Sequence, residues 1–127
     1  PTPVLERGRL AVDDDLRLVG CANTFALGDL SARPGSPWPA SAQVAMQQGD
    51  ATAAAIAQLR MEQEPQPFQF EDRGEMLSLG VGDATLTGMG LTLAGPLAFQ
   101  LRRATYLTRL PGLSLGLRSA GAWLLNR

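Results

Sequence analysis

The sequence predicts an α+β fold in which short β segments precede one long helix, followed by a small β region and C-terminal helices. Three observations lead to this prediction. An apolar stretch ends at Gly28, a segment rich in Ala and Gln from 42 to 63 repeats its apolar residues with a helical period, and the last third is rich in leucine. A chain of 127 residues fits one modest domain or a part of a larger protein.

The N-terminal segment is predicted to form short strands separated by turns. Arg9–Val12 has strand character, Asp13–Asp15 is typical of a polar turn, and Leu16–Val19 resumes the apolar alternation. We expect Thr24–Leu27 to be a buried strand that stops at Gly28-Asp29.

A helix is predicted from about residue 42 to residue 63, after a loop rich in Pro, Gly and Ser. Ser41 stands at the N-cap position, and Pro65 and Pro67 are expected to end the helix. The residues that recur near a period of 3.6 are Val44, Ala45, Gln48, Ala51, Ala55 and Leu59.

A second β region and a helical C-terminus are predicted beyond the prolines. Phe68–Phe70 is expected to start the β region, and Met76–Gly80 with Asp83–Thr87 is expected to form a hairpin. A Pro-Gly pair divides the last third into two helical stretches, 96–110 and 115–125.

Composition excludes several kinds of site. The chain has no histidine, so imidazole triads and histidine-containing zinc sites cannot be assembled from it alone. A single cysteine, Cys21, excludes an internal disulfide. We predict no catalytic side chain, no metal site and no nucleic-acid partner. No apolar run approaches the ~18 residues that cross a bilayer.

The charges divide sharply along the chain. All 12 acidic residues lie between Glu6 and Asp83, whereas the stretch from Ala84 to Arg127 has five arginines and no acid. A tail of one sign with many apolar residues predicts an anionic partner surface, with a membrane as the first candidate. The alternative is a basic face that packs against an acidic region of the same protein.

Gly28-Asp29 is the first candidate ligand site. The carboxyl ends of buried strands are where open α/β sheets bind ligands. Gly28 allows a ligand to approach the backbone closely, and Asp29 can accept a hydrogen bond from a ligand hydroxyl. An ordinary turn is the alternative.

The start of the predicted helix is the second candidate. A helix N-terminus presents unpaired N–H groups and the positive end of the helix dipole, which suits a group that gains negative charge, such as a reduced flavin. Gln43 and Gln47 are four residues apart and therefore share a helix face. Their amides suit the carbonyl oxygens of a quinone. The alternative is that both are solvated helix glutamines.

These residues resemble two nested protein groups. Gly8–Asp13, Leu16-Arg17 and Asn23–Asp29 are similar to the last FAD-contacting segment of the flavoproteins with two dinucleotide-binding domains. Within that group, Ser41–Gln48 resembles the Ala-Gln motif of type II NADH:quinone oxidoreductases. Further matches to the C-terminal region of that family are Pro67-Phe68, Gly74, Ser78–Gly80 and Arg103–Leu110.

The resemblance implies a non-pumping, single-subunit enzyme that passes hydride from NAD(P)H to FAD and electrons from the flavin to a membrane quinone. The chain would be its C-terminal portion. The acid that matches Asp29 binds ribityl or ribose hydroxyls of FAD, and the helix start touches the isoalloxazine. The cofactor-binding residues that the resemblance implies are Gly28, Asp29, Ala42, Gln43 and Val44.

The resemblance further implies that Gln43 and Gln47 line the quinone pocket. Residues 1–64 would be the end of a Rossmann-like FAD-binding domain, and residues 65–127 a C-terminal domain with a β-hairpin and membrane-associating helices. No Gly-x-Gly-x-x-Gly occurs, so both dinucleotide-binding fingerprints, including the NAD(P)H site, are expected upstream. This piece alone is expected to be inactive. Leu30-Ser31, where the family has a small residue or cysteine, is a mild departure.

The C-terminal helices are predicted to bind the cytoplasmic face of a membrane as a peripheral anchor. Arg102, Arg103 and Arg109 lie mostly off an apolar stripe, and Trp123 suits a headgroup interface. The stripe consists of Leu97, Leu101, Ala104, Leu107 and Leu110. The alternative is packing on the same protein or a homodimer contact.

Two other functions stay open at this point. One is a soluble FAD-dependent pyridine-nucleotide oxidoreductase with an acceptor other than quinone. The other is a non-catalytic module for membrane binding or dimerisation.

Overall fold

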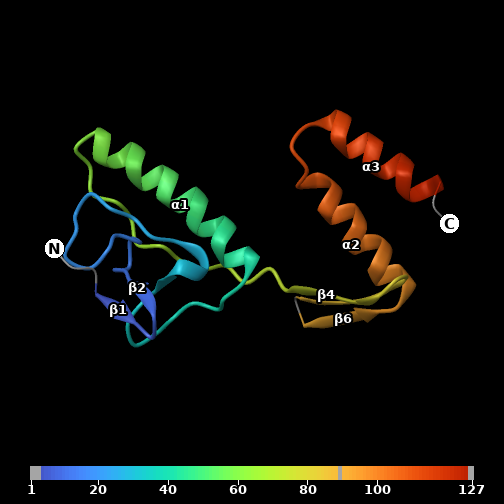
Figure 1. The fold of residues 1–127 in the computed structure, drawn as a ribbon, viewed down its shortest axis with the longest axis horizontal. Coiled ribbons are helices and arrows are strands. Elements are labelled where there is room, and N and C mark those ends of the chain that lie inside the picture. Colours follow the sequence, from blue (N-terminus) through green and yellow to red (C-terminus); the bar gives the residue numbers. More distant parts are fainter. Residues whose placement is uncertain (1–3, 89, 126–127) are drawn as a thin grey trace. The chain divides into compact units, whose positions relative to one another are not determined.

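The computed structural model describes residues 4–88 and 90–125 and has the predicted α+β content, with three α-helices and two small sheets among these residues (Figure 1). The chain divides into two compact units, Pro1–Asp72 and Arg73–Arg127. This division lies eight residues beyond the predicted one at 64/65. The assignment of the two parts to an FAD-binding domain and a C-terminal domain stays a prediction.

The first unit contains a small three-stranded sheet. β1 (Leu5–Glu6) pairs antiparallel with β2 (Arg9–Ala11), as expected for two strands joined by a tight turn, and β3 (Ser31–Ala32) pairs parallel with β2. The parallel pairing places Leu10 opposite Ser31. The sheet therefore brings the residues that follow Gly28 back to the first strands of the chain.

The prediction that Thr24–Leu27 forms a buried strand was wrong. The segment makes one antiparallel bridge, between Arg17 and Phe25. Only Ala26 is buried, at 3% exposed, whereas Phe25 is half-buried and Thr24 and Leu27 are exposed. Its partner segment cannot continue the ladder, because Leu16 has a φ of 69° and turns the chain. The pairing is limited to a few hydrogen bonds, such as Leu18 N–H to the Thr24 carbonyl at 2.8 Å.

The core of the first unit gathers apolar side chains from the turns as well as from the end of the unit. Its buried members are Val12, Leu16, Leu18, Ala26 and Phe68. Cys21 and Trp38 pack against this cluster, and the Trp38 and Phe68 rings meet edge to face at 5.3 Å.

Phe68–Phe70 was predicted to start the second β region, and this prediction was also wrong. Phe68 is 7% exposed in the core of the first unit, and its N–H donates to the Asp14 carbonyl at 2.7 Å. A single backbone hydrogen bond to a turn does not make a ladder. Among the described residues, the second β region begins only at Glu75.

Helix α1 (Ala42–Arg60) begins where it was predicted to begin. The Ser41 hydroxyl accepts a hydrogen bond from Val44 N–H at 3.2 Å, which confirms the N-cap. The helix ends three residues before the predicted end, because Glu62 adopts a φ of 57° and Met61 N–H bonds to the Gln58 carbonyl. The buried face of α1 consists of Val44, Gln48, Thr52 and Ala55.

The second unit is an antiparallel sheet with two helices. β4 (Glu75–Gly80) and β5 (Asp83–Gly88) form the predicted hairpin. A third strand that was not predicted, β6 (Leu91–Ala94), pairs antiparallel with β5. All four residues of β6 are exposed, so the stretch lacks the in-and-out alternation by which a half-buried strand is recognised.

Helices α2 (Pro96–Thr108) and α3 (Leu113–Leu125) occupy the stretches where helices were predicted. Helix α2 packs on β5 and β6, with Ala98 fully buried, and α3 contacts α2 (Figure 1). The Arg103 guanidinium lies over the rings of Phe99, at 5.6 Å, and Trp123, at 4.4 Å, and so links the two helices.

Replacing Gly74 by Ala is expected to destabilise the β4–β5 hairpin more than replacing Gly82. Both glycines have a φ in the left-handed region, 89° and 82°, so both substitutions carry a backbone cost of about 1–2 kcal/mol. A Cβ at Gly74 would also overlap the Thr87 carbonyl oxygen and lie 2.7 Å from the Gly88 Cα, whereas a Cβ at Gly82 meets open space. Hydrogen exchange of the hairpin amides measures the difference, and equal loss of protection in both variants would contradict the structure.

Candidate functional site

Gly28 stands at the end of the apolar segment, and its backbone is hydrogen-bonded to helix α1. It opens a short 3₁₀ turn, Gly28–Leu30, and its N–H donates to the Oε1 of Gln48 at 2.7 Å. Its φ is 65°, and a Cβ here would lie 3.4 Å from the Cβ of Ala45. The two predicted parts of the site, Gly28-Asp29 and the start of α1, therefore lie side by side.

Asp29 follows Gly28 in the same turn and has an exposed side chain. Within the described residues it makes no hydrogen bond or ion pair, whereas the backbone of the turn is closed by Ser31 Oγ, which donates to the Gly28 carbonyl at 3.2 Å. The turn thus holds a carboxylate toward solvent beside α1. This arrangement suits a hydroxyl-bearing ligand.

The three residues predicted at the helix start differ in accessibility. Ala42 is exposed and Gln43 is half-buried, whereas Val44 is 3% exposed and gives its N–H to the Ser41 hydroxyl. Val44 thus packs in the interior of the first unit. Any group bound at this helix end meets Ala42 and Gln43 first.

Gln43 and Gln47 share a face of α1, as predicted, and their amides are in contact. Gln47 Nε2 lies 3.4 Å from Gln43 Oε1. The Gln47 amide is also engaged with the backbone of Glu71: Nε2 donates to the Glu71 carbonyl at 2.9 Å, and Oε1 accepts from Glu71 N–H at 3.0 Å. The structure thus adds Glu71 to the surroundings of the two predicted glutamines.

Gln48 is a site residue that the sequence analysis missed in this role. It is 1% exposed and supplies the acceptor for Gly28 N–H. The sequence does indicate this role, because Gln48 lies on the apolar face of the predicted helix, between Val44 and Ala51. A buried amide needs a hydrogen-bond partner, so a glutamine at such a position indicates a contact with a neighbouring backbone.

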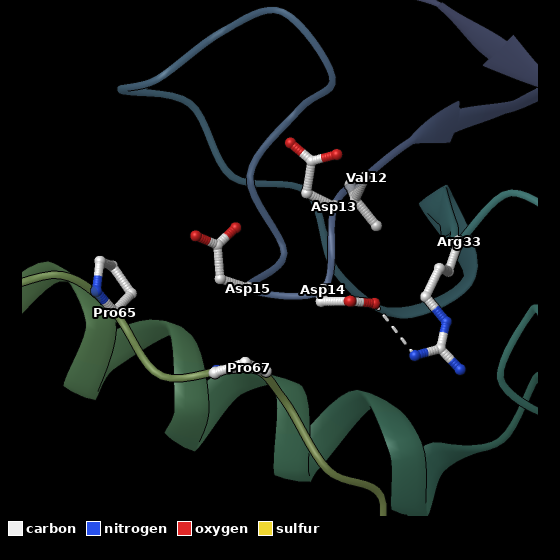
Figure 2. A pocket seen from close by; sticks show the side chains of 7 residues that line it. All are labelled: Val12, Asp13, Asp14, Asp15, Arg33, Pro65 and Pro67. Carbon is white, nitrogen blue, oxygen red and sulfur yellow. Dashed lines mark hydrogen bonds and ion pairs between the residues drawn. The ribbon is translucent and has the colours of Figure 1, made fainter.

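An open depression of about 340 Å³ lies elsewhere on the first unit (Figure 2). It is lined by Val12, Asp13, Asp14, Asp15, Arg33, Pro65 and Pro67, and none of the predicted site residues is among them. Asp14 Oδ1 pairs with Arg33 Nη1 at 3.1 Å, the contact that Figure 2 marks with a dashed line. The Arg33 guanidinium in turn lies 4.6 Å from the centre of the Trp38 ring.

Two acids of this depression, Asp14 and Asp15, are paired with the arginines Arg33 and Arg17. Asp15 hydrogen-bonds the Arg17 guanidinium and, with the nearby charge of Glu64, raises the pKa of Arg17 above its ordinary value. Among residues 4–88 and 90–125, no three His, Cys, Asp or Glu side chains gather closely enough to hold a metal ion. The depression therefore shows the features of a paired, solvated surface.

The helices of the second unit expose many apolar side chains. Leu97 and Leu101 of the predicted stripe are 61% and 44% exposed, while Leu107 and Leu110 are half-buried. Leu113, Leu117, Leu124 and Leu125 are each at least 70% exposed. In the described part of the chain, no helix combines the length and the apolar character that crossing a membrane requires.

The chain is similar to several quinone-reducing enzymes. It is 39% identical over 115 residues to the alternative NAD(P)H-ubiquinone oxidoreductase C1, chloroplastic/mitochondrial, of Arabidopsis thaliana. This alignment covers 86% of the chain and 22% of the relative. It is 36% identical to the demethylphylloquinone reductase NdbB of Synechocystis, in an alignment that covers 98% of the chain and 33% of the relative. It is 37% identical to a type II NADH:quinone oxidoreductase of Staphylococcus epidermidis, in an alignment that covers 78% of the chain and 26% of the relative.

These similarities cover most of the chain but only a part of each relative. The chain spans between 22% and 33% of the length of these three proteins. No family model matches the chain.

Gln48→Met is expected to destabilise the first unit by about 1–3 kcal/mol, because it leaves Gly28 N–H without its acceptor at nearly unchanged side-chain volume. Gln66→Met, at an exposed position outside α1, is the matched control and is expected to stay within about 0.5 kcal/mol of the unsubstituted chain. Urea unfolding measures both. Equal stability of the two variants would show that the Gln48–Gly28 bond does not hold the turn on α1.

Proposed function

Because the chain belongs to the type II NADH:quinone oxidoreductase family and matches a C-terminal portion of its members, we propose that the full-length protein passes electrons from NAD(P)H through FAD to a quinone, and that this chain carries the acceptor side. The observation that supports this most directly is the contact of Gly28 with Ala45 and Gln48 of α1. It joins the flavin-type Gly-Asp turn to the helix that carries the Ala-Gln motif.

The residues beside Gly28 fit an FAD. Gly28 has no side chain to obstruct the approach of a ligand to the turn, and the exposed Asp29 carboxylate could accept hydrogen bonds from ribityl or ribose hydroxyls. Ala42 and Gln43, with Val44 behind them, would place the positive end of the α1 dipole beside a bound flavin ring. When bound, FAD would supply the redox chemistry by taking up hydride and giving up two electrons. Residues 1–64 then form the end of a Rossmann-like FAD domain.

Gln43 is the residue that we assign to the quinone. A quinone carbonyl accepts hydrogen bonds and carries no donor, so a neutral side-chain amide recognises it through N–H without adding charge. Gln43 is half-buried in the first turn of α1, the end of the helix that adjoins the Gly28 turn. Gln47, one helical turn further on, lies 3.4 Å from Gln43 Oε1 and is assigned to the same acceptor site.

The C-terminal helices are the part that we assign to the membrane surface. Their exposed leucines provide apolar area, and the four arginines of α2, its C-terminal end and α3 attract anionic headgroups without a competing acid after Asp83. The protein would then sit as a peripheral protein on the cytoplasmic face, where a membrane quinone is within reach. A homodimer contact on the same leucines is the competing assignment.

Gln43→Ala in the full-length protein is expected to raise the KM for quinone about 5- to 10-fold, because one hydrogen bond to the acceptor is lost. The rate with ferricyanide, which needs no carbonyl-binding amide, is the internal reference, and quinone reduction is expected to fall relative to it. Steady-state kinetics with both acceptors gives the ratio.

Gln58→Ala, on the same helix but remote from its start, is the matched control for this experiment. An unchanged ratio in the Gln43 variant would remove the assignment of Gln43. Failure of the unsubstituted full-length protein to reduce quinone would instead assign it to the flavoproteins that use another acceptor.

Co-sedimentation with vesicles that contain anionic lipid tests the membrane assignment. Full-length protein is expected to bind them and to be released as salt rises, because arginines near a charged surface contribute about 1 kcal/mol each and are screened by salt. Truncation after Gly95 removes α2 and α3 and is expected to abolish binding. Equal binding by the truncated protein would exclude these helices, and concentration-dependent dimerisation lost on truncation would favour the homodimer contact.

A further inference from the structure

The side-chain amide of Gln47 takes the place of a neighbouring peptide group. It both donates to the carbonyl of Glu71 and accepts from its N–H, at 2.9 and 3.0 Å. Two residues directly opposite each other in an antiparallel ladder exchange the same pair of bonds. Here one partner is a side chain from α1.

This pairing holds a segment that has no regular structure of its own. Between Arg60 and Glu75 the described chain forms no helix or strand, so its backbone groups need other partners. Phe68 N–H bonds to the Asp14 carbonyl, and Glu71 bonds to Gln47. The last residues of the first unit are thus tied to α1 beside the Ala-Gln motif.

The same amide also sets the orientation of Gln43. A glutamine amide has two N–H donors, and those of Gln47 are directed at two oxygens, the Glu71 carbonyl and Gln43 Oε1. If Nε2 and Oε1 of Gln47 exchanged places, the amide N–H groups would face Glu71 N–H, and two donors would oppose each other. The backbone of Glu71 therefore fixes which way the Gln47 amide points, and through it how the Gln43 amide is turned.

We propose that Gln47 is a positioning residue of the acceptor site, which holds Glu71 against α1 and orients Gln43, and that it does not itself hydrogen-bond the quinone. A quinone carbonyl can only accept a hydrogen bond. To receive one from Gln47 Nε2, it would have to displace the Glu71 carbonyl oxygen or Gln43 Oε1, to which this group already donates. The inference rests on the proposed function, because it takes Gln43 to be the residue that meets the quinone.

Hydrogen exchange in the full-length protein tests the contact directly. Gln47→Met removes both hydrogen-bonding groups at similar volume, so the Glu71 amide is expected to exchange at least about 10-fold faster. Gln58→Met, the same substitution further along α1, is expected to leave this amide unchanged. Unchanged exchange in Gln47→Met would overturn the proposal, whatever the kinetics show.

A double-mutant cycle tests how Gln47 acts on the acceptor. Gln47→Met alone is expected to raise the KM for quinone about 5- to 10-fold with little change in kcat, because it disturbs binding through Gln43. In a Gln43→Ala background the same substitution is expected to change KM less than about 2-fold, since the group that it orients is gone. Loss of folded enzyme would instead lower kcat at constant KM.

Each remaining outcome has one meaning. Additive effects of the two substitutions on KM would show that Gln47 meets the quinone independently, and would overturn its role as a positioning residue. A fall in kcat alone would reduce Gln47 to a structural residue. If Gln43→Ala leaves quinone reduction unchanged, the assignment of Gln43 to the quinone fails and the positioning role of Gln47 fails with it, while the exchange experiment still reports whether the contact with Glu71 exists. If the unsubstituted protein does not reduce quinone, the proposed function itself fails.

Discussion

The contact between Gly28 and the buried amide of Gln48 is the constraint on which the candidate site depends. The turn at Gly28 follows a segment that is not a regular strand, so no ladder fixes its position. Gln48 provides the acceptor from inside the helix–turn interface, and the missing side chain at Gly28 lets the turn approach Ala45. Because a buried amide without a partner is costly, helix and turn stay together, and Asp29 is held beside the start of α1.

Helix α1 holds irregular backbone in the same way at a second place. Gln47 pairs with Glu71 much as Gln48 pairs with Gly28, one residue further round the helix. Two consecutive glutamines on a helix point in directions about 100° apart, so one pair can serve two segments on different sides. This explains why a unit with only short strands can present defined side chains: the helix supplies the hydrogen bonds that a wide sheet would otherwise supply.

The sequence predicted the elements with local signals and missed those decided by distant contacts. Ser41 and the period of the following residues are sufficient to locate the start of α1, and the Val81-Gly82 turn indicates the hairpin. By contrast, Thr24–Leu27 has the composition of a strand but lacks a partner, because Leu16 turns away. Phe68 has strand character as well, yet it serves the core of the first unit. The candidate site residues were predicted from their local pattern and from resemblance, whereas Gln47 and Gln48 bond to residues 24 and 20 positions away, which no local pattern indicates.

Three arginines of the C-terminal helices lie over aromatic rings, in a part of the sequence that has no acidic residue after Asp83. Arg102 and Arg109 lie over the Tyr106 ring at 4.6 and 5.7 Å, and Arg103 lies over Phe99 and Trp123. Ring faces stabilise a guanidinium without neutralising it. The positive charge of these helices is therefore kept beside exposed leucines, and burying such a surface against an apolar protein face would desolvate the arginines at a cost in free energy.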